Sequence, residues 1–187
     1  MTVEMKLSAD RRLEWAAGKV AEDKMAWMYG PYFAAMGPVM AEHGNETAAG
    51  FVVVDASGTG AKPASGVFSS WPSAEAHAGF HTDPRFLEVV EERDASFEMF
   101  TGGHFVDAHD EVLVLNTDHD YALVIAATQS LPQPPIIDLK VSDDNKRTNH
   151  QGKSLALYPW TDAAEELRVA PGDGAEVYRI RFNPAAR

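Results

Sequence analysis

The sequence contains no cysteine, and this absence excludes disulfide bonds, thiol catalysis and thiolate metal sites together. It also contains no run that approaches the roughly 20 apolar residues of a membrane-spanning helix. The first residues, Met1 to Leu7, lack the basic and then apolar pattern of a secretory signal. We therefore expect a soluble, cytoplasmic protein with no membrane partner.

Basic residues are scarce relative to acidic ones. The 187 residues include 16 lysines and arginines against 28 aspartates and glutamates, which gives a net charge of −12 at pH 7. Binding to nucleic-acid phosphates or to an anionic membrane needs clustered basic residues, so we expect no nucleic-acid partner. The apolar fraction of 45% and the charged fraction of 24% are those of an ordinary globular protein with an apolar core.

One stretch in the middle of the chain has the clearest local pattern. Gly66–Trp71 predicts a short strand, and Ser73 predicts the N-cap of the helix that follows. Asp83, followed by proline, predicts the start of a second helix that continues to Met99. Gly103–Asp107 then predicts another strand. The unit is a strand, a broken helix and a strand.

Periodicity predicts the elements before this stretch. Alternating apolar residues over Thr2–Leu7 indicate a strand, whereas the composition from Ala9 to Tyr29 indicates a helix. The helix resumes over Tyr32–His43, where Gly44 stops it. Thr47–Ala56 then forms a hairpin with the strand that ends at Trp71.

The C-terminal part of the sequence predicts mainly strands. Two apolar runs joined by a short polar loop predict a hairpin, an edge strand follows, and the chain ends on a strand, a capped helix and a strand. In chain order, these segments are Glu111–Thr117, Tyr121–Ala127, Ile136–Val141, Ser154–Tyr158, Thr161–Val169 and Ala175–Phe182.

Three short motifs carry a resemblance to a known superfamily. They are Ala41-Glu42-His43-Gly44, which ends a helix, Trp71-Pro72-Ser73-Ala74-Glu75-Ala76, and Asp83-Pro84-Arg85-Phe86, which opens a helix. Together they resemble the dimeric α/β-barrel superfamily, in particular its short uncharacterised families, which are related to the antibiotic-biosynthesis monooxygenases and to the YCII-related proteins. The resemblance covers Met25 to Ala108. It implies an α+β fold with a ferredoxin-like βαββαβ unit whose sheet packs against a second sheet, usually that of a partner.

The resemblance and the order of elements predict two units and a homodimer. We expect residues 1–110 to form the ferredoxin-like α/β-barrel unit, and residues 111–187 to form a second, smaller α+β unit that packs on the first. A sheet with helices on one face leaves its other face, which is apolar, open to solvent. A second copy of the chain typically covers that face. That reason for dimerisation weakens if the C-terminal half covers the face.

The residues most suited to a binding site converge near Trp71. We expect a site between sheet and helices, with the aromatic rings and imidazoles as ligand contacts. The ligand-binding candidates are Tyr29, Tyr32, Trp71, His77 and His81. His104 is the candidate base, because a neutral imidazole can accept a proton near pH 7.

Each of these candidates has a simpler alternative. The aromatic segment that contains Tyr29 and Tyr32 is also typical of core packing, and His104 could be an ordinary half-buried strand residue. His77 and His81, four residues apart on a helix, project from one face and could share a metal ion, but such pairs also occur on surfaces. We predict no metal site and no cofactor.

Three classes of function follow from these features. The first is a small-molecule-binding protein without catalysis, because pocket-type residues are present and no catalytic motif is. The second is a cofactor-independent monooxygenase or isomerase that acts on an aromatic or polyketide-like compound, which the resemblance implies. The third is a structural or assembly module without a ligand.

Overall fold

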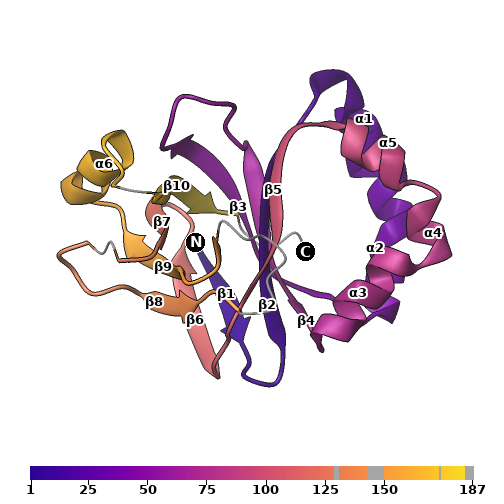
Figure 1. Ribbon diagram of the computed structural model, residues 1–187, viewed down its shortest axis with the longest axis horizontal. Helices are drawn as coiled ribbons and strands as arrows, with labels where there is room; N and C mark the ends of the chain where they lie inside the picture. Colours follow the sequence, from indigo (N-terminus) through magenta and orange to yellow (C-terminus); the bar gives the residue numbers. More distant parts are fainter. Residues whose placement is uncertain (129–130, 143–149, 173, 184–187) are drawn as a thin grey trace.

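The computed structural model describes residues 1–128, 131–142, 150–172 and 174–183, and of His104 it describes the backbone alone. Over these residues the protein has an α+β fold with antiparallel strands (Figure 1). None of the helices in these ranges is both long and apolar enough to cross a membrane.

Within the described ranges, eight strands form one sheet in which all neighbouring strands are antiparallel. Across the sheet they are β5 (Phe97–Val106), β2 (Arg12–Val20), β4 (Ser65–Trp71), β3 (Glu46–Ala56), β10 (Glu176–Phe182), β7 (Tyr121–Ala126), β9 (Ser154–Pro159) and β8 (Ile137–Lys140). The first four belong to the N-terminal half of the chain and the last four to the C-terminal half. Each half has the same spatial order, with its fourth strand first, followed by its first, third and second strands.

Two further strands form a separate antiparallel pair. These strands are β1 (Thr2–Leu7) and β6 (Glu111–Asn116), which run past each other from Thr2 opposite Asn116 to Leu7 opposite Glu111. Buried side chains alternate with exposed ones along both strands, and the buried set joins the central core. The pair therefore covers part of the space between the two halves of the large sheet.

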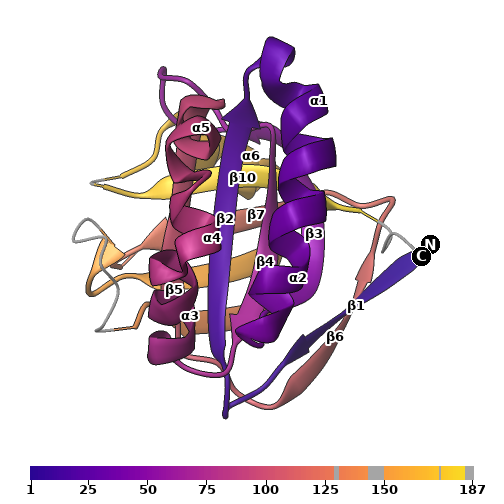
Figure 2. The same ribbon diagram turned by 90° about the vertical axis from the view of Figure 1, so that its right-hand side faces the viewer.

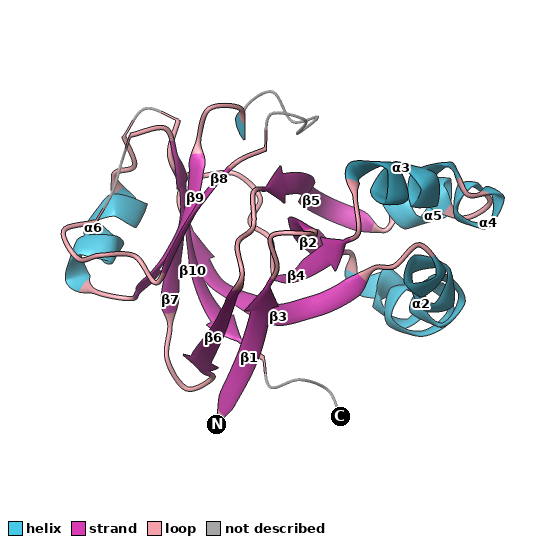
Figure 3. Ribbon diagram, turned by 90° about the horizontal axis from the view of Figure 1, so that it is seen from below, coloured by secondary structure: helices cyan, strands magenta, loops and turns pink. Residues whose placement is uncertain are grey.

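Helices cover the outer side of each half, as Figures 1 and 3 show. The N-terminal half has one helical segment after β2 and another after β4, and both lie in front of β2, β4 and β5 in Figure 2. The first helical segment consists of η1 (Glu22–Lys24), α1 (Met25–Trp27), a π-helical turn η2 (Met28–Tyr32) and α2 (Phe33–Glu42). The second helical segment consists of α3 (Ala74–Thr82), α4 (Pro84–Leu87) and α5 (Val90–Ala95). On the C-terminal half, α6 (Asp162–Val169) covers the opposite outer side.

The inner faces of the two halves share one core. Trp15, Phe51 and Phe68 come from the N-terminal half, and Leu123 and Phe182 from the C-terminal half, and all are almost fully buried in one cluster. The apolar face for which we expected a second copy of the chain is thus covered by the chain's own C-terminal half. This removes the stated reason for a homodimer, and the oligomeric state itself stays a prediction.

The local signals in the middle of the sequence are confirmed. Ser73 caps α3, its hydroxyl accepting from the backbone N–H of Ala76 at 3.1 Å, and Asp83 caps α4 by accepting from the N–H of Arg85 at 2.9 Å. Gly44 follows α2 with a φ of +78°, the left-handed conformation expected of a residue that ends a helix.

The expected helix over Ala9–Tyr29 is wrong in its first half, because Arg12–Val20 is the strand β2. Leu13, Trp15 and Ala17 face the inner core, and the intervening residues face the helices, which is the period of a strand. The segment is rich in helix-forming residues, but β2 pairs along both edges, with β4 and β5. Tertiary pairing overrides local propensity here.

Two other expectations need correction. The segment after Pro84 ends its helical part at Ala95 instead of Met99, because β5 begins at Phe97. The hairpin of Glu111–Thr117 with Tyr121–Ala127 does not form, because β6 pairs with β1 and both edges of β7 are taken by β9 and β10.

The division of the chain at residue 110 stays a prediction. β1 pairs with β6 across that boundary, and β3 pairs with β10, so the large sheet is continuous over both halves.

Candidate functional site

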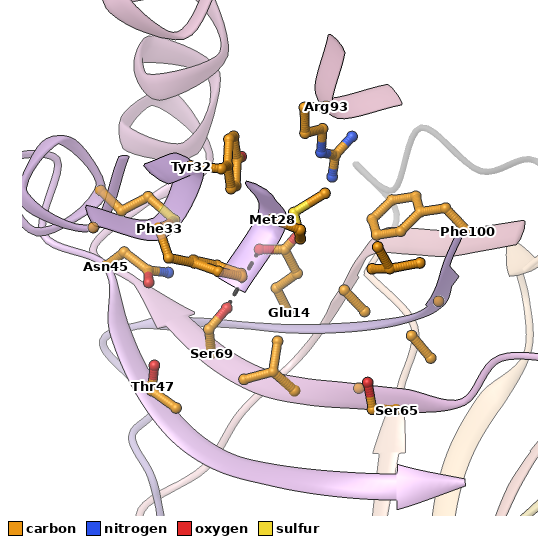
Figure 4. A pocket seen from close by; sticks show the side chains of 18 of the residues that line it. Glu14, Met28, Tyr32, Phe33, Asn45, Thr47, Ser65, Ser69, Arg93 and Phe100 are labelled. Atoms are coloured by element: carbon orange, nitrogen blue, oxygen red, sulfur yellow. Dashed lines mark hydrogen bonds between the residues drawn. The ribbon is translucent and has the colours of Figure 1, made fainter. Parts of the chain in front are cut away.

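A cavity of about 600 Å³ lies between the outer face of the N-terminal half of the sheet and its two helical segments. Strands β2 and β4 supply its floor, η2 and α2 one wall, and the segment from α3 to β5 the other. Figure 4 shows part of the lining, with Glu14 and Ser69 on the strands and Tyr32 and Phe33 on the helical side. The cavity thus lies where the sequence placed a site, between sheet and helices.

Several small residues line this space. Ala16 and Gly18 line it from β2, and Gly66 lines it from β4. On α2, Gly37 lines the cavity, and a β-carbon at this position would have no atom within 4 Å. At Gly37 the space is therefore open because the sequence leaves out a side chain, whereas a β-carbon at Gly18 or Gly66 would meet neighbouring atoms at 3.0 Å or less.

The π-helical turn η2 brings aromatic and sulfur-containing side chains to the cavity. Pro31 has no N–H to donate within the helix, which favours this irregular turn at Gly30-Pro31. The lining residues Tyr29 and Phe33 are 56% and 46% exposed, so they lie at the mouth of the cavity. Tyr32 is buried.

Arg93 supplies a positive charge on the opposite wall. Its guanidinium carbon lies 4.5 Å from the ring centre of Phe100 and 5.2 Å from that of Phe97, and all three residues line the cavity. Its Nη1 also lies 2.6 Å from a carboxylate oxygen of Asp94. Burial raises the pKa of the Tyr32 hydroxyl and nearby Arg93 offsets only part of that rise, so Tyr32 stays a neutral phenol at pH 7.

Glu14 places a carboxylate on the apolar floor. Its side chain is 13% exposed and projects from β2 opposite Ser69 of β4. Trp71 Nε1–H donates to its Oε2 at 2.6 Å, and the Ser69 hydroxyl donates to the same oxygen at 3.4 Å. Burial raises the pKa of Glu14, but the hydrogen bond and charge of His77, the Trp71 N–H and the charge of His81 together hold it below its ordinary 4.5. Glu14 is therefore ionised at neutral pH.

His77 and His81 continue from Glu14 along α3. His77 is buried behind Glu14, with its Nε2 3.4 Å from Glu14 Oε1. His81 lines the cavity, is exposed, and has its Nε2 3.0 Å from Nε2 of His77. The two rings thus share one helix face, as their spacing predicted. Among the residues that the structure describes, no group of three His, Asp or Glu side chains is arranged to hold a metal ion.

The sequence-predicted ligand residues gather at this cavity. Tyr29, Tyr32, Trp71 and His81 line it, and His77 contacts Glu14 from behind. Their role in binding a ligand stays a prediction. His104 lies on β5 with its backbone opposite Trp15, and its side chain is outside the described part of the structure, so its role as a base also stays a prediction.

Sequence reasoning missed Glu14 and Arg93. Glu14 fell within a segment interpreted as helix, although it is the single acidic residue within a strand-like alternation of Leu13, Trp15 and Ala17. Arg93 follows Glu91 and Glu92 in a segment whose charged residues predict a solvated helix face, and no feature of the sequence distinguishes it from them.

No family model and no curated protein matches the sequence. One solved structure, titled as a crystal structure study of an anthrone oxidase-like protein, is similar over 96% of this chain and 95% of that chain, with 13% identity and a TM-score of 0.46. A likeness at this level carries no argument about the function of this chain.

Proposed function

We propose that this protein binds a flat, mostly apolar molecule of two or three fused rings that carries a hydroxyl or carbonyl group. The observation that supports this is the cavity of about 600 Å³, which combines an aromatic lining with one buried carboxylate. Small-molecule sites typically measure roughly 300–1,000 Å³ and combine apolar walls with a few polar groups. Aromatic walls favour a flat ligand, because ring faces and edges pack on one another.

Glu14 and Arg93 determine the polar contacts of such a ligand. Ionised Glu14 can accept from a ligand hydroxyl, while Arg93 can donate to a carbonyl or phenolate oxygen. A hydrogen bond to a charged group contributes roughly 1.5–3 kcal/mol, which corresponds to about 10- to 100-fold in affinity. A ligand with the hydroxyl should therefore bind more tightly than one of the same shape without it.

The test is a calorimetric titration with three bicyclic probes: 2-naphthol, 2-tetralone and 2-methoxynaphthalene. We expect 2-naphthol to bind at least about ten-fold more tightly than its methyl ether, which cannot donate to Glu14. Binding of none of the three at millimolar concentration would overturn the proposed function.

Gly37 offers a matched pair of variants for the same titration. Gly37→Phe puts a ring into the cavity from a position with no atom within 4 Å of the β-carbon, while Gly37→Ala changes the helix but adds only a methyl group. If the ring displaces about 60 Å² of ligand contact, the loss at roughly 25 cal/mol/Å² is about 1.5 kcal/mol, or about ten-fold in affinity. Equal affinities for the two variants would place binding elsewhere on the protein.

We also propose that each half of the chain is a ferredoxin-like unit. The support is the shared strand order, in which the fourth, first, third and second strands are neighbours. The described residues between β7 and β8 contain no helix that would correspond to the one after the first strand of the N-terminal half. The two-sheet arrangement of the dimeric α/β-barrel superfamily would then occur within one chain.

A homodimer remains a prediction. Light scattering tests it by distinguishing a mass of 20.4 kDa from twice that mass. A small molecule rather than a nucleic acid or membrane is the partner we propose, and a cytoplasmic location stays a prediction.

A further inference from the structure

Three titratable side chains form a line from the cavity floor to the surface. Glu14 Oε1 lies 3.4 Å from His77 Nε2, and that same nitrogen lies 3.0 Å from His81 Nε2. His77 is buried and Glu14 is largely buried, with side chains 9% and 13% exposed, whereas His81 is exposed at the rim. A proton on Glu14 thus has a route of two short steps to solvent.

The position of Glu14 distinguishes it from the many surface carboxylates of this acidic chain. Among the described residues that line the cavity it is the one carboxylate, and its Oε2 is held by Trp71 and Ser69. The other titratable and charged groups among the described lining residues are Tyr29 and Tyr32 from η2, Arg93 from α5 and His81 from α3. Of the lining residues that the structure describes, Arg93 alone has a permanent positive charge.

We propose that Glu14 is a general base that removes a proton from a carbon next to the carbonyl group of a bound aromatic ketone, and that His77 and His81 pass this proton to solvent. The proposal rests on the proposed binding function and adds a proton transfer to it. It assigns the base to Glu14, on the cavity floor.

The step balances without an oxidant or a reductant. The ligand C–H bond breaks, its electron pair stays on the ligand as an enolate, and the proton bonds to a carboxylate oxygen of Glu14. The proton then moves to Nε2 of His77, which becomes an imidazolium, and from the same nitrogen to His81. Return of a proton to the same carbon gives exchange with solvent, and return to a conjugated carbon gives a shifted double bond. Arg93 is placed to stabilise the enolate oxygen, where negative charge develops.

The experiment measures exchange of the acidic ring hydrogens of 2-tetralone with D₂O by NMR, with binding measured separately by calorimetry. Positioned acid–base groups typically contribute about 10²- to 10⁴-fold. We expect the protein to accelerate exchange above buffer, and Glu14→Gln to lose about 100-fold or more of that acceleration while it still accepts from Trp71 and still binds the ketone. Glu4→Gln, at an exposed position of β1, is the matched control and should leave the rate unchanged.

The pH profile separates a relay from a structural role for His77. The acid limb that is due to Glu14 should lie below pH 4.5, because His77 and Trp71 hold the pKa of Glu14 low despite its burial. His77→Gln removes part of that effect, so the acid limb of the profile should move to higher pH while the rate at its plateau falls. Movement of this limb with an unchanged plateau rate would show a structural role alone and would overturn the relay through His77.

The outcomes distinguish the two proposals. Binding of 2-tetralone with exchange that depends on Glu14 supports both. Binding with exchange no faster than in buffer overturns the proton transfer and leaves the binding function. Absence of binding overturns both. If Glu14→Gln does not fold, the wild-type profile decides, because a rate with no acid limb would exclude a carboxylate base.

Discussion

Glu176 allows a pH-dependent test of the packing between β10 and the segment at His150. Its Oε1 lies 2.6 Å from Nε2 of the buried His150, and Tyr178 donates its hydroxyl to Oε2 at 2.7 Å. Burial raises the pKa of Glu176, but the bonds from His150 and Tyr178 and the charges of His150 and Lys153 outweigh it and lower the pKa from 4.5 to about 2. At 1.36 kcal/mol per pH unit, this difference corresponds to roughly 3 kcal/mol of stability. The side chain is 30% exposed, so solvent screening reduces our expectation to about 2 kcal/mol.

The sign of this effect follows from the lowered pKa. The stabilisation is complete above pH 4.5, the value for the unfolded chain, and is lost as the pH falls toward 2. Glu176→Gln should therefore reduce the free energy of unfolding by about 2 kcal/mol at pH 7, and the difference from wild type should shrink between pH 4.5 and 2. Urea titrations followed by circular dichroism at pH 7, 4 and 3 measure it, with Glu4→Gln as the exposed control. An equal loss at pH 7 and pH 3 would refute the electrostatic origin.

Two further predictions concern stability. Gly66→Ala should destabilise the protein by about 1–3 kcal/mol, because the new β-carbon would lie 2.5 Å from the backbone oxygen of Ala16. Gly37→Ala, where the β-carbon has no atom within 4 Å, should be neutral or stabilising by up to about 1 kcal/mol. Thermal unfolding compares the two variants, and equal changes in their melting temperatures would contradict the close approach of β2 and β4. Asp120→Asn should lower the free energy of unfolding in urea by about 2 kcal/mol, because the 7% exposed carboxylate pairs with both Arg179 and Arg181, which are partly exposed. If the substitution lowers stability by the same amount when Arg179 and Arg181 are also replaced, the effect does not come from these ion pairs.

Local chemistry in the sequence predicted the parts of the fold that depend on few neighbours. The caps Ser73 and Asp83 and the stop at Gly44 follow from hydrogen bonds and backbone conformation within one turn. The β-branched run in Thr47–Ala56 and the loop after it predicted β3 and its pairing with β4. These features needed no knowledge of the rest of the chain.

Long-range pairing is what the sequence did not reveal. β2 has the composition of a helix and becomes a strand because two neighbours complete its hydrogen bonds. β6 follows the first unit in sequence but pairs with β1, which lies more than 100 residues earlier. Since Glu14 lies on β2, an incorrect assignment of that strand also hid the carboxylate of the cavity.

The most direct test of the proposed binding function is a crystal structure of the protein with 2-naphthol. We expect the rings inside the cavity between Phe33, Phe100 and Trp71, with the naphthol oxygen about 2.7 Å from a carboxylate oxygen of Glu14. Naphthol bound at another surface, with only solvent beside Glu14, would contradict the proposal.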